Sequence, residues 1–184
     1  LISACLSARA RAQSEAMCGG EPFRFILNDV KGRLFEGPAS VTKAPVVLFF
    51  YQGYKSGDVL DNLRQALKRD SIVGDGTRLG ELWAGIPIID YKEGWFVPGW
   101  AIDKVLRDKM AKHPKTIFLQ DKGECMTKSG ASPKCPAGTR IPYFKSNVGS
   151  VAVVYRGYLV KKFAGPTEAE PFVELIRKLT AQSE

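Results

Sequence analysis

The chain has 184 residues, which is enough for one domain with a substantial hydrophobic core. Apolar residues make up 45% of the sequence and charged residues 25%, a balance that excludes a collagen, a coiled coil or a long disordered chain. The formal net charge is +8, but the basic residues are scattered and accompany no nucleic-acid motif, so nucleic acid is not expected as a partner.

The first residues resemble the end of a secretory signal peptide. Residues 1–12 are mostly small and apolar, and two overlapping A-x-A patterns between residues 8 and 12 offer cleavage sites. Residues 1–20 are therefore predicted to be a signal-peptide remnant with an N-terminal extension, and residues 21–184 to be the folded domain. This interpretation places the protein in the periplasm of a bacterial cell envelope. Three alternatives stay open, namely a lipid anchor at Cys5, a frayed N-terminal helix and a sequence that starts too far upstream.

The first half of the chain contains two clear strand signals and one helix signal. Partial alternation predicts a strand over residues 23–28, followed by a turn and a short strand around 33–35. Residues 45–51 form a continuous run of β-branched and aromatic residues, which is typical of a strand buried on both faces. Apolar residues then recur at helical spacing over 58–70, so this part indicates the first half of a βαβ unit.

The second half of the chain alternates between strand and helix signals. The predicted elements are a strand at 86–91, a helix at 100–112, a strand at 115–121, a hairpin of strands at 150–155 and 158–163, and a helix at 167–182. The helix at 100–112 is expected to gather Ile102, Val105, Leu106 and Met110 on one apolar face.

This order of elements predicts an α/β fold with a single thioredoxin-like domain. A central parallel pair of strands, a terminal antiparallel hairpin and a last helix make a mixed central sheet flanked by helices. The irregular segment 122–142, which contains Cys125 and Cys135, would be a loop inserted into that domain.

Several stretches resemble the YtfJ-like family of periplasmic proteins within the thioredoxin-like (redoxin) superfamily. The turn from Asp29 to Gly32 and the core strand are redoxin-like, and the closer likeness lies at residues 97–99 with 115–123, at 149–160 and at 162–170. The resemblance covers roughly residues 22–180. It implies a thioredoxin-like fold and a periplasmic location without a settled activity, and it offers no counterpart for the loop with the two cysteines.

In a redox-active thioredoxin fold, the helix dipole ionises a cysteine at the start of the helix that follows the core strand. Here that loop contains no cysteine and consists of Gln52, Gly53, Tyr54, Lys55 and Ser56. The proline that usually faces this place, before the terminal hairpin, is replaced by Gly149 and Ser150. The loop and Ser150 are therefore candidate binding residues for a carboxylate or phosphate, and an ordinary capped loop is the alternative.

Cys125 and Cys135 flank a polar loop that has no core of its own. In an oxidising periplasm a structural disulfide is the default, and by the chain-entropy estimate it would add roughly 2–3 kcal/mol of stability. A redox-active bridge stays open as an alternative. No metal site and no cofactor are expected, because two cysteines are half of a zinc site and His113 is the sole histidine. Cys18 is expected to be free or partnered elsewhere.

The sequence thus predicts a redox-inactive thioredoxin-like protein of the cell envelope. It would act as a binding or interaction module for an unknown envelope protein or a small anionic ligand. The alternative is a thiol-disulfide oxidoreductase that uses Cys125 and Cys135 in a non-standard position. Trp83, Trp95 and Trp100 are expected in the hydrophobic core, with a ligand groove as their alternative.

Overall fold

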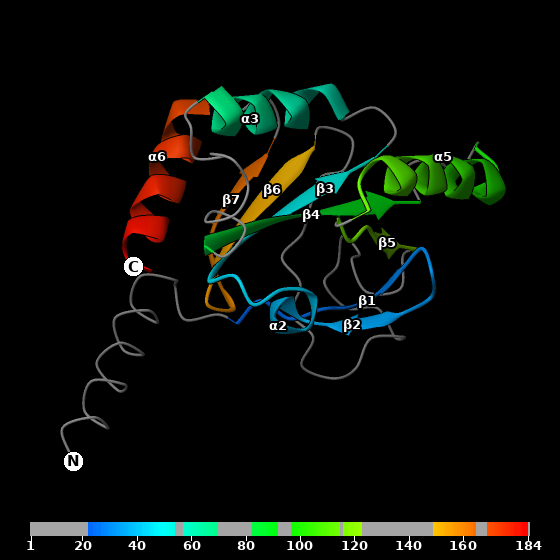
Figure 1. Cartoon of the computed structure of the whole chain (residues 1–184), viewed down its shortest axis with the longest axis horizontal. Helices are drawn as coiled ribbons and strands as arrows, with labels where there is room; N and C mark the ends of the chain where they lie inside the picture. The colour runs from blue at the N-terminus through cyan, green and yellow to red at the C-terminus, as the bar shows by residue number, and fades with distance from the viewer. Residues whose placement is uncertain are drawn as a thin grey trace, which may run out of the picture.

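The computed structural model describes residues 22–53, 57–69, 82–91, 97–114, 116–122, 149–164 and 169–183. In this part of the chain, a mixed sheet is flanked by helices (Figure 1). The strands are β1 (Ile26–Asp29), β2 (Leu34–Glu36), β3 (Val46–Gln52), β4 (Trp83–Asp90), β5 (Leu119–Asp121), β6 (Ser150–Tyr155) and β7 (Tyr158–Ala164). The helices are α2 (Pro38–Val41), α3 (Gly57–Arg69), α5 (Gly99–Lys112) and α6 (Ala169–Ala181).

The strands lie in the order β2-β1-β5-β4-β3-β6-β7. The neighbours β3, β4 and β5 are parallel, whereas β6 and β7 form an antiparallel hairpin beside β3, and β1 runs antiparallel to both β5 and β2. Parallel strands require crossover connections, and α3 and α5 lie in these connections. The carboxyl ends of β3, β4 and β5 therefore meet at one edge of the sheet, where α/β proteins place their binding sites.

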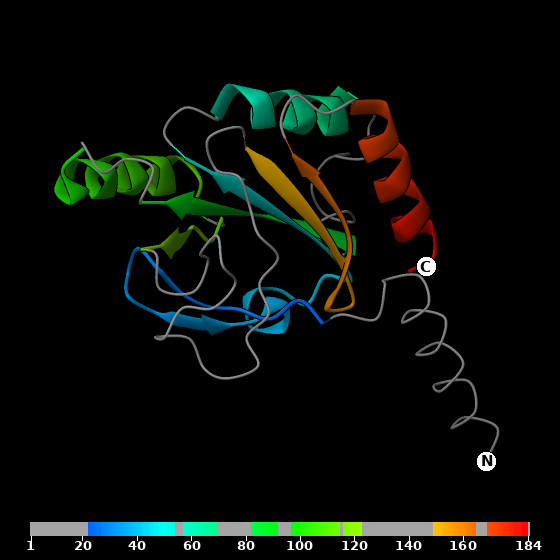
Figure 2. The same cartoon turned by 180° about the vertical axis from the view of Figure 1, so that it is seen from behind.

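One face of the sheet is covered by α3 and α6, which Figures 1 and 2 show on the same side. Alternate residues of β3, namely Val46, Leu48 and Phe50, belong to a buried cluster with the apolar residues of these two helices. In this cluster the ring of Phe172 on α6 meets that of Phe163 on β7 edge to face, with 5.4 Å between centroids. The apolar residues at helical spacing in α3 and α6 therefore face the sheet and are buried, as the sequence predicts.

The opposite face is covered by the segment that precedes β1. The rings of Phe23 and Phe25 pack on Phe49 of β3, with centroid distances of 5.0 and 5.2 Å. The backbone N–H of Phe23 donates a 2.8 Å hydrogen bond to the carbonyl of Gly157, in the turn between β6 and β7. This segment therefore runs across the sheet from the hairpin towards β1, and every residue of β3 is buried, as its continuous apolar run predicts.

The predicted elements agree with the structure except at some boundaries. β4 begins at Trp83 rather than at residue 86, because it pairs with β3 over the whole length of that strand. Gly85 relieves crowding in this pairing, since a Cβ there would lie only 3.3 Å from the ring of Phe50. β5 is only three residues long, because the chain turns after α5, where the N–H of Thr116 donates to the carbonyl of His113. The sequence analysis did not predict the one-turn helix α2.

The prediction for the apolar face of α5 is wrong in part. Leu106 is buried, but Val105 is 54% exposed, because α5 lies beside the carboxyl end of β4 (Figure 1) and buries only Leu106. Trp100, expected in the core, is 69% exposed, whereas Trp83 is half-buried and packs against the core. Trp95 lies outside the described residues.

The predicted boundary between the N-terminal extension and the domain also lies outside the described residues, as do Cys5 and Cys18. Within the described ranges, no helix has both the length and the apolar character that a membrane crossing requires.

Candidate functional site

The predicted site lies where β3 ends and β6 begins. Gln52 is the last residue of β3 and Gly53 follows it, while Ser150 opens β6 and pairs with Tyr51 in the antiparallel register. The fold therefore brings Gln52, Gly53 and Ser150 together, as the topology of the predicted domain requires.

Other residues of the predicted site fall outside the described part of the chain. These are Tyr54, Lys55 and Ser56 in the loop before α3, and Cys125 and Cys135 in the inserted segment. Their roles as ligand-binding residues and as a disulfide stay predictions.

Gln52 is held inside the fold by a side chain of α3. Its side chain is buried, and Nη2 of Arg64 donates a 3.2 Å hydrogen bond to its Oε1 atom. The same guanidinium lies over the ring of Phe50, 4.7 Å from the centroid, and donates to Asp61 at 2.6 Å. The amide oxygen of Gln52 therefore already has a partner, and the contact joins α3 to the end of β3.

The entry into β6 has a backbone conformation that proline cannot adopt. Gly149 has φ = +69°, in the left-handed region, whereas the proline ring fixes φ near about −65°. Ser150, which follows, is 1% exposed. A left-handed glycine and a buried serine thus open β6.

A pair of aspartates, one buried and one half-buried, lies at the same edge of the sheet and was not predicted from the sequence. Asp90 and Asp121 end β4 and β5 and are partners in the parallel register. The hydroxyl of Tyr51 donates a 2.8 Å hydrogen bond to Oδ2 of Asp121, which is 1% exposed. Burial above all, and then the charges of Asp121 and Asp90, raise the pKa of Tyr51, so its hydroxyl keeps its proton at neutral pH.

The signal for this pair was present in the sequence. Each of the two parallel strands ends in an aspartate, and the carboxyl ends of parallel strands meet at one edge. What was missing was the strand order, which places β5 beside β4 and both within reach of β3.

A second polar network lies on the side of α5. The hydroxyl of Tyr91, directly after β4, donates a 2.6 Å hydrogen bond to Oδ1 of Asp103 and accepts one of 2.7 Å from Nε2 of Gln120. Nζ of Lys122 lies 5.5 Å from the centroid of the Tyr91 ring. Burial first, and then the hydrogen bond and charge of Asp103, raise the pKa of Tyr91.

The chemistry available at this edge is hydrogen bonding and charge. The site residues in the described ranges supply hydroxyls, carboxylates, amides and two cationic side chains, and none of them is a thiol. Within those ranges, no three side chains of histidine, cysteine or acidic residues are grouped to hold a metal ion. Such an edge is suited to binding a polar ligand.

Solved structures with the same architecture are thioredoxin-like proteins. A putative thioredoxin from Neisseria meningitidis is 10% identical, with a TM-score of 0.54, and the match covers 89% of this chain and 91% of that one. The exposed lipoprotein thioredoxin Etrx1 of Streptococcus pneumoniae is 14% identical, with a TM-score of 0.51, and the match covers 85% and 99%.

A third similar structure is the C-terminal domain of a putative thiol-disulfide oxidoreductase from Bacteroides thetaiotaomicron. It is 11% identical, with a TM-score of 0.53, over 86% of this chain and 93% of that domain. No family model and no curated protein sequence matches the chain. The fold is thus thioredoxin-like, as predicted. Sequence identities this low show that the fold is shared and nothing about the activity.

Proposed function

We propose that this protein is a redox-inactive, thioredoxin-like protein of the bacterial cell envelope that binds a partner protein or a small ligand with an anionic group. The observation that carries the proposal is the junction of β3 and α3. There the chain reads Gln52, Gly53 and three further residues without a cysteine, at the place where a thioredoxin keeps its reactive thiol.

Disulfide exchange requires a thiolate that attacks a disulfide and forms a mixed disulfide. Glutamine, glycine, tyrosine, lysine and serine side chains at residues 52–56 cannot take that step. The start of β6, which lies beside the end of β3, also favours a redox-inactive protein. Gly149 enters this strand with a positive φ that proline cannot adopt.

The envelope location rests on two observations. The first residues resemble the end of a signal peptide. In addition, one of the proteins with a similar fold is an exposed lipoprotein. Membership of the YtfJ-like family would agree with both and is part of the proposal. Fractionation of the host bacterium tests the location: we expect the protein in the periplasmic fraction, cleaved at one of the A-x-A patterns between residues 8 and 12, and recovery only from the cytoplasm would contradict it.

The redox half of the proposal is tested by the reduction potential of the Cys125–Cys135 pair. A glutathione titration of the full chain, read by thiol trapping and mass spectrometry, measures it. We expect a structural bridge with a potential below about −300 mV. A value of about −120 to −230 mV, in the range of exchange catalysts, would overturn the proposal and favour an oxidoreductase with a relocated site. A Cys18→Ser variant is the control for exchange with the third thiol.

A further inference from the structure

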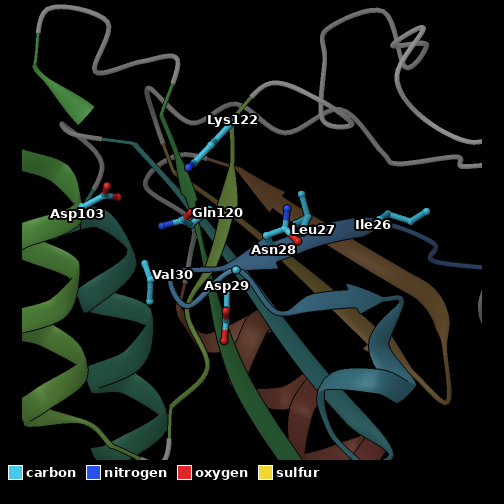
Figure 3. A pocket seen from close by; sticks show the side chains of 9 residues that line it. Ile26, Leu27, Asn28, Asp29, Val30, Asp103, Gln120 and Lys122 are labelled. Carbon is cyan, nitrogen blue, oxygen red and sulfur yellow. The ribbon is translucent and has the colours of Figure 1, made fainter. Parts of the chain in front are cut away.

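A small polar cavity lies between β1, β5 and α5, beside the Tyr91 network. Its volume is about 250 Å³, and the polar side chains around it are Asn28, Asp103, Gln120 and Lys122. Figure 3 shows Asp103 from α5 and Lys122 from the end of β5 pointing towards Gln120, while Asp29 points away. Drug-sized ligands occupy pockets of about 300–1,000 Å³, so this cavity fits a smaller molecule.

The hydrogen bonds around Tyr91 fix which way the amide of Gln120 faces. The hydroxyl of Tyr91 has one proton, and it donates that proton to the carboxylate of Asp103. Its oxygen can therefore only accept from Gln120, so the atom 2.7 Å away must be the amide nitrogen. The amide oxygen Oε1 must then face the other way.

The amide oxygen of Gln120 is a buried hydrogen-bond acceptor. Gln120 is 6% exposed, and among the residues that the structure describes no donor reaches its Oε1 atom. Buried polar atoms without a partner are rare, because each costs free energy unless a hydrogen bond compensates for lost water. The cavity beside Gln120 is the place from which a ligand N–H group can supply that bond.

Two opposite charges accompany this acceptor. Asp103 uses Oδ1 for Tyr91, and in the described part of the chain its Oδ2 atom has no hydrogen-bond donor. Lys122 is exposed at the rim, and its ammonium lies over the ring of Tyr91 rather than in an ion pair within the described residues. The cavity therefore offers two hydrogen-bond acceptors and a cation. That arrangement disfavours a simple anion or a simple cation, because each meets a like charge.

We propose that this cavity binds a free α-amino acid in its zwitterionic form. The ligand ammonium donates to Oε1 of Gln120 and Oδ2 of Asp103, and the ligand carboxylate lies against Lys122. The proposal names a site separate from the β3–α3 junction, and it stands or fails independently of whether Cys125 and Cys135 exchange disulfides.

Titration of the isotopically labelled full chain with each standard L-amino acid tests the proposal by NMR, with the side-chain amide of Gln120 as the probe. We expect at least one amino acid to shift this signal in a saturable way. The matching amine without the carboxylate, and the matching acid without the amine, should bind at least about tenfold more weakly. The amino acid amide should also bind more weakly, which separates a free amino acid from the N-terminus of a peptide.

Two variants locate the ligand. Lys122→Met removes the exposed cation, and we expect a loss of affinity of about 10- to 100-fold, as for a hydrogen bond to a charged group. Lys112→Met, on the exposed end of α5, is the matched control and should leave the affinity unchanged. The proposal is overturned if no amino acid shifts the Gln120 signal, if the amide binds as well as the free acid, or if Lys122→Met and the control bind alike.

Discussion

The hydroxyl of Tyr51, on the central strand β3, donates a 2.8 Å hydrogen bond to Oδ2 of Asp121, which lies 70 positions later at the end of β5. Asp90 on the intervening strand is the register partner of Asp121, so two carboxylates and a phenol share the edge of the sheet. Because Asp121 is 1% exposed, hydrogen-bond donors such as the hydroxyl of Tyr51 offset the free-energy cost of burying its carboxylate.

Tyr51→Phe is therefore expected to destabilise the protein. The change keeps the ring in the core but removes one donor from a buried carboxylate, which costs about 1–3 kcal/mol. The free energy of unfolding in urea measures the loss. Tyr155→Phe is the matched control, because within the described residues no hydrogen bond of the buried Tyr155 hydroxyl is present, and it should cost less than about 0.5 kcal/mol. Equal losses in the two variants would contradict this role for the hydroxyl.

The same contact predicts a loss of stability at alkaline pH. The pKa of Tyr51 is raised above its ordinary value of 10.0 in the folded protein, by burial first and then by the charges of Asp121 and Asp90. Above about pH 10, the unfolded chain therefore releases a proton that the folded chain keeps. Stability is fully present below pH 10 and falls by about 1.4 kcal/mol per pH unit above it, until the folded pKa is reached.

Urea midpoints measured from neutral to alkaline pH check this prediction. The slope should be shallower in Tyr51→Phe, because the residue that carries this linkage is gone. An identical alkaline slope in both proteins would show that Tyr51 titrates alike in the folded and unfolded chains. Tyr91, which is half-buried and whose pKa is also raised, contributes to the slope that remains.

The turn between β1 and β2 depends on Asp29. Its Oδ1 atom accepts 2.8 Å hydrogen bonds from the N–H groups of Lys31 and Arg33, and its Oδ2 atom accepts one of 2.7 Å from Nε of Arg33. We expect Asp29→Ala to cost about 2–3 kcal/mol in the free energy of unfolding. Arg33→Ala should cost less than about 1 kcal/mol, because that guanidinium is 60% exposed.

The pH dependence of Asp29 has the opposite sign. Burial alone would raise its pKa, but the hydrogen bonds from Arg33 and Lys31 and the charge of Arg33 outweigh it and lower the pKa below 3.8. Its contribution is present above about pH 4 and is lost as the pH falls through the folded value. Acid unfolding followed by circular dichroism should be less steep in Asp29→Ala. A stability loss that is the same in both arginine and aspartate variants would contradict the role of the backbone bonds.

Arg64 should stabilise the end of β3 through Gln52 and Phe50. Arg64→Ala removes the hydrogen bond to the buried amide and uncovers the ring of Phe50, so we expect a loss of about 1–2 kcal/mol. Asp61→Ala breaks only the exposed ion pair of Arg64 and should cost less than about 1 kcal/mol. Chemical denaturation compares the two variants, and a larger loss in Asp61→Ala would contradict this assignment.

The main lines of the fold could be predicted from the sequence because its strongest patterns are local. The apolar run at residues 45–51 identifies a doubly buried strand, and α3 and α6 follow from helical spacing. The errors occur where tertiary packing determines which apolar residues are buried. Trp100 and Val105 are apolar, but they lie on α5, beside the carboxyl end of β4 (Figure 1), where the rest of the fold covers little of the helix surface.

The candidate sites were predicted less completely, for a related reason. Gln52 and Ser150 could be placed because the chain order of a thioredoxin-like domain brings those two strand ends together. The pairs Tyr51–Asp121 and Tyr91–Asp103 depend on strand order, register and the docking of α5, which no local pattern encodes. In the sequence, Gln120 is only one polar residue of a predicted strand. The hydrogen bonds around it show that its amide oxygen has no donor among the described residues.

The most direct test of the central claim is an assay of disulfide exchange, in which dithiothreitol reduces insulin. The rate with the full chain is compared with the uncatalysed rate and with the rate in the presence of an active thioredoxin. Our account predicts that the protein leaves the uncatalysed rate unchanged and that Cys125→Ser and Cys135→Ser variants behave like the wild type. A rate increase that is lost in either cysteine variant would contradict the account and make this protein an oxidoreductase.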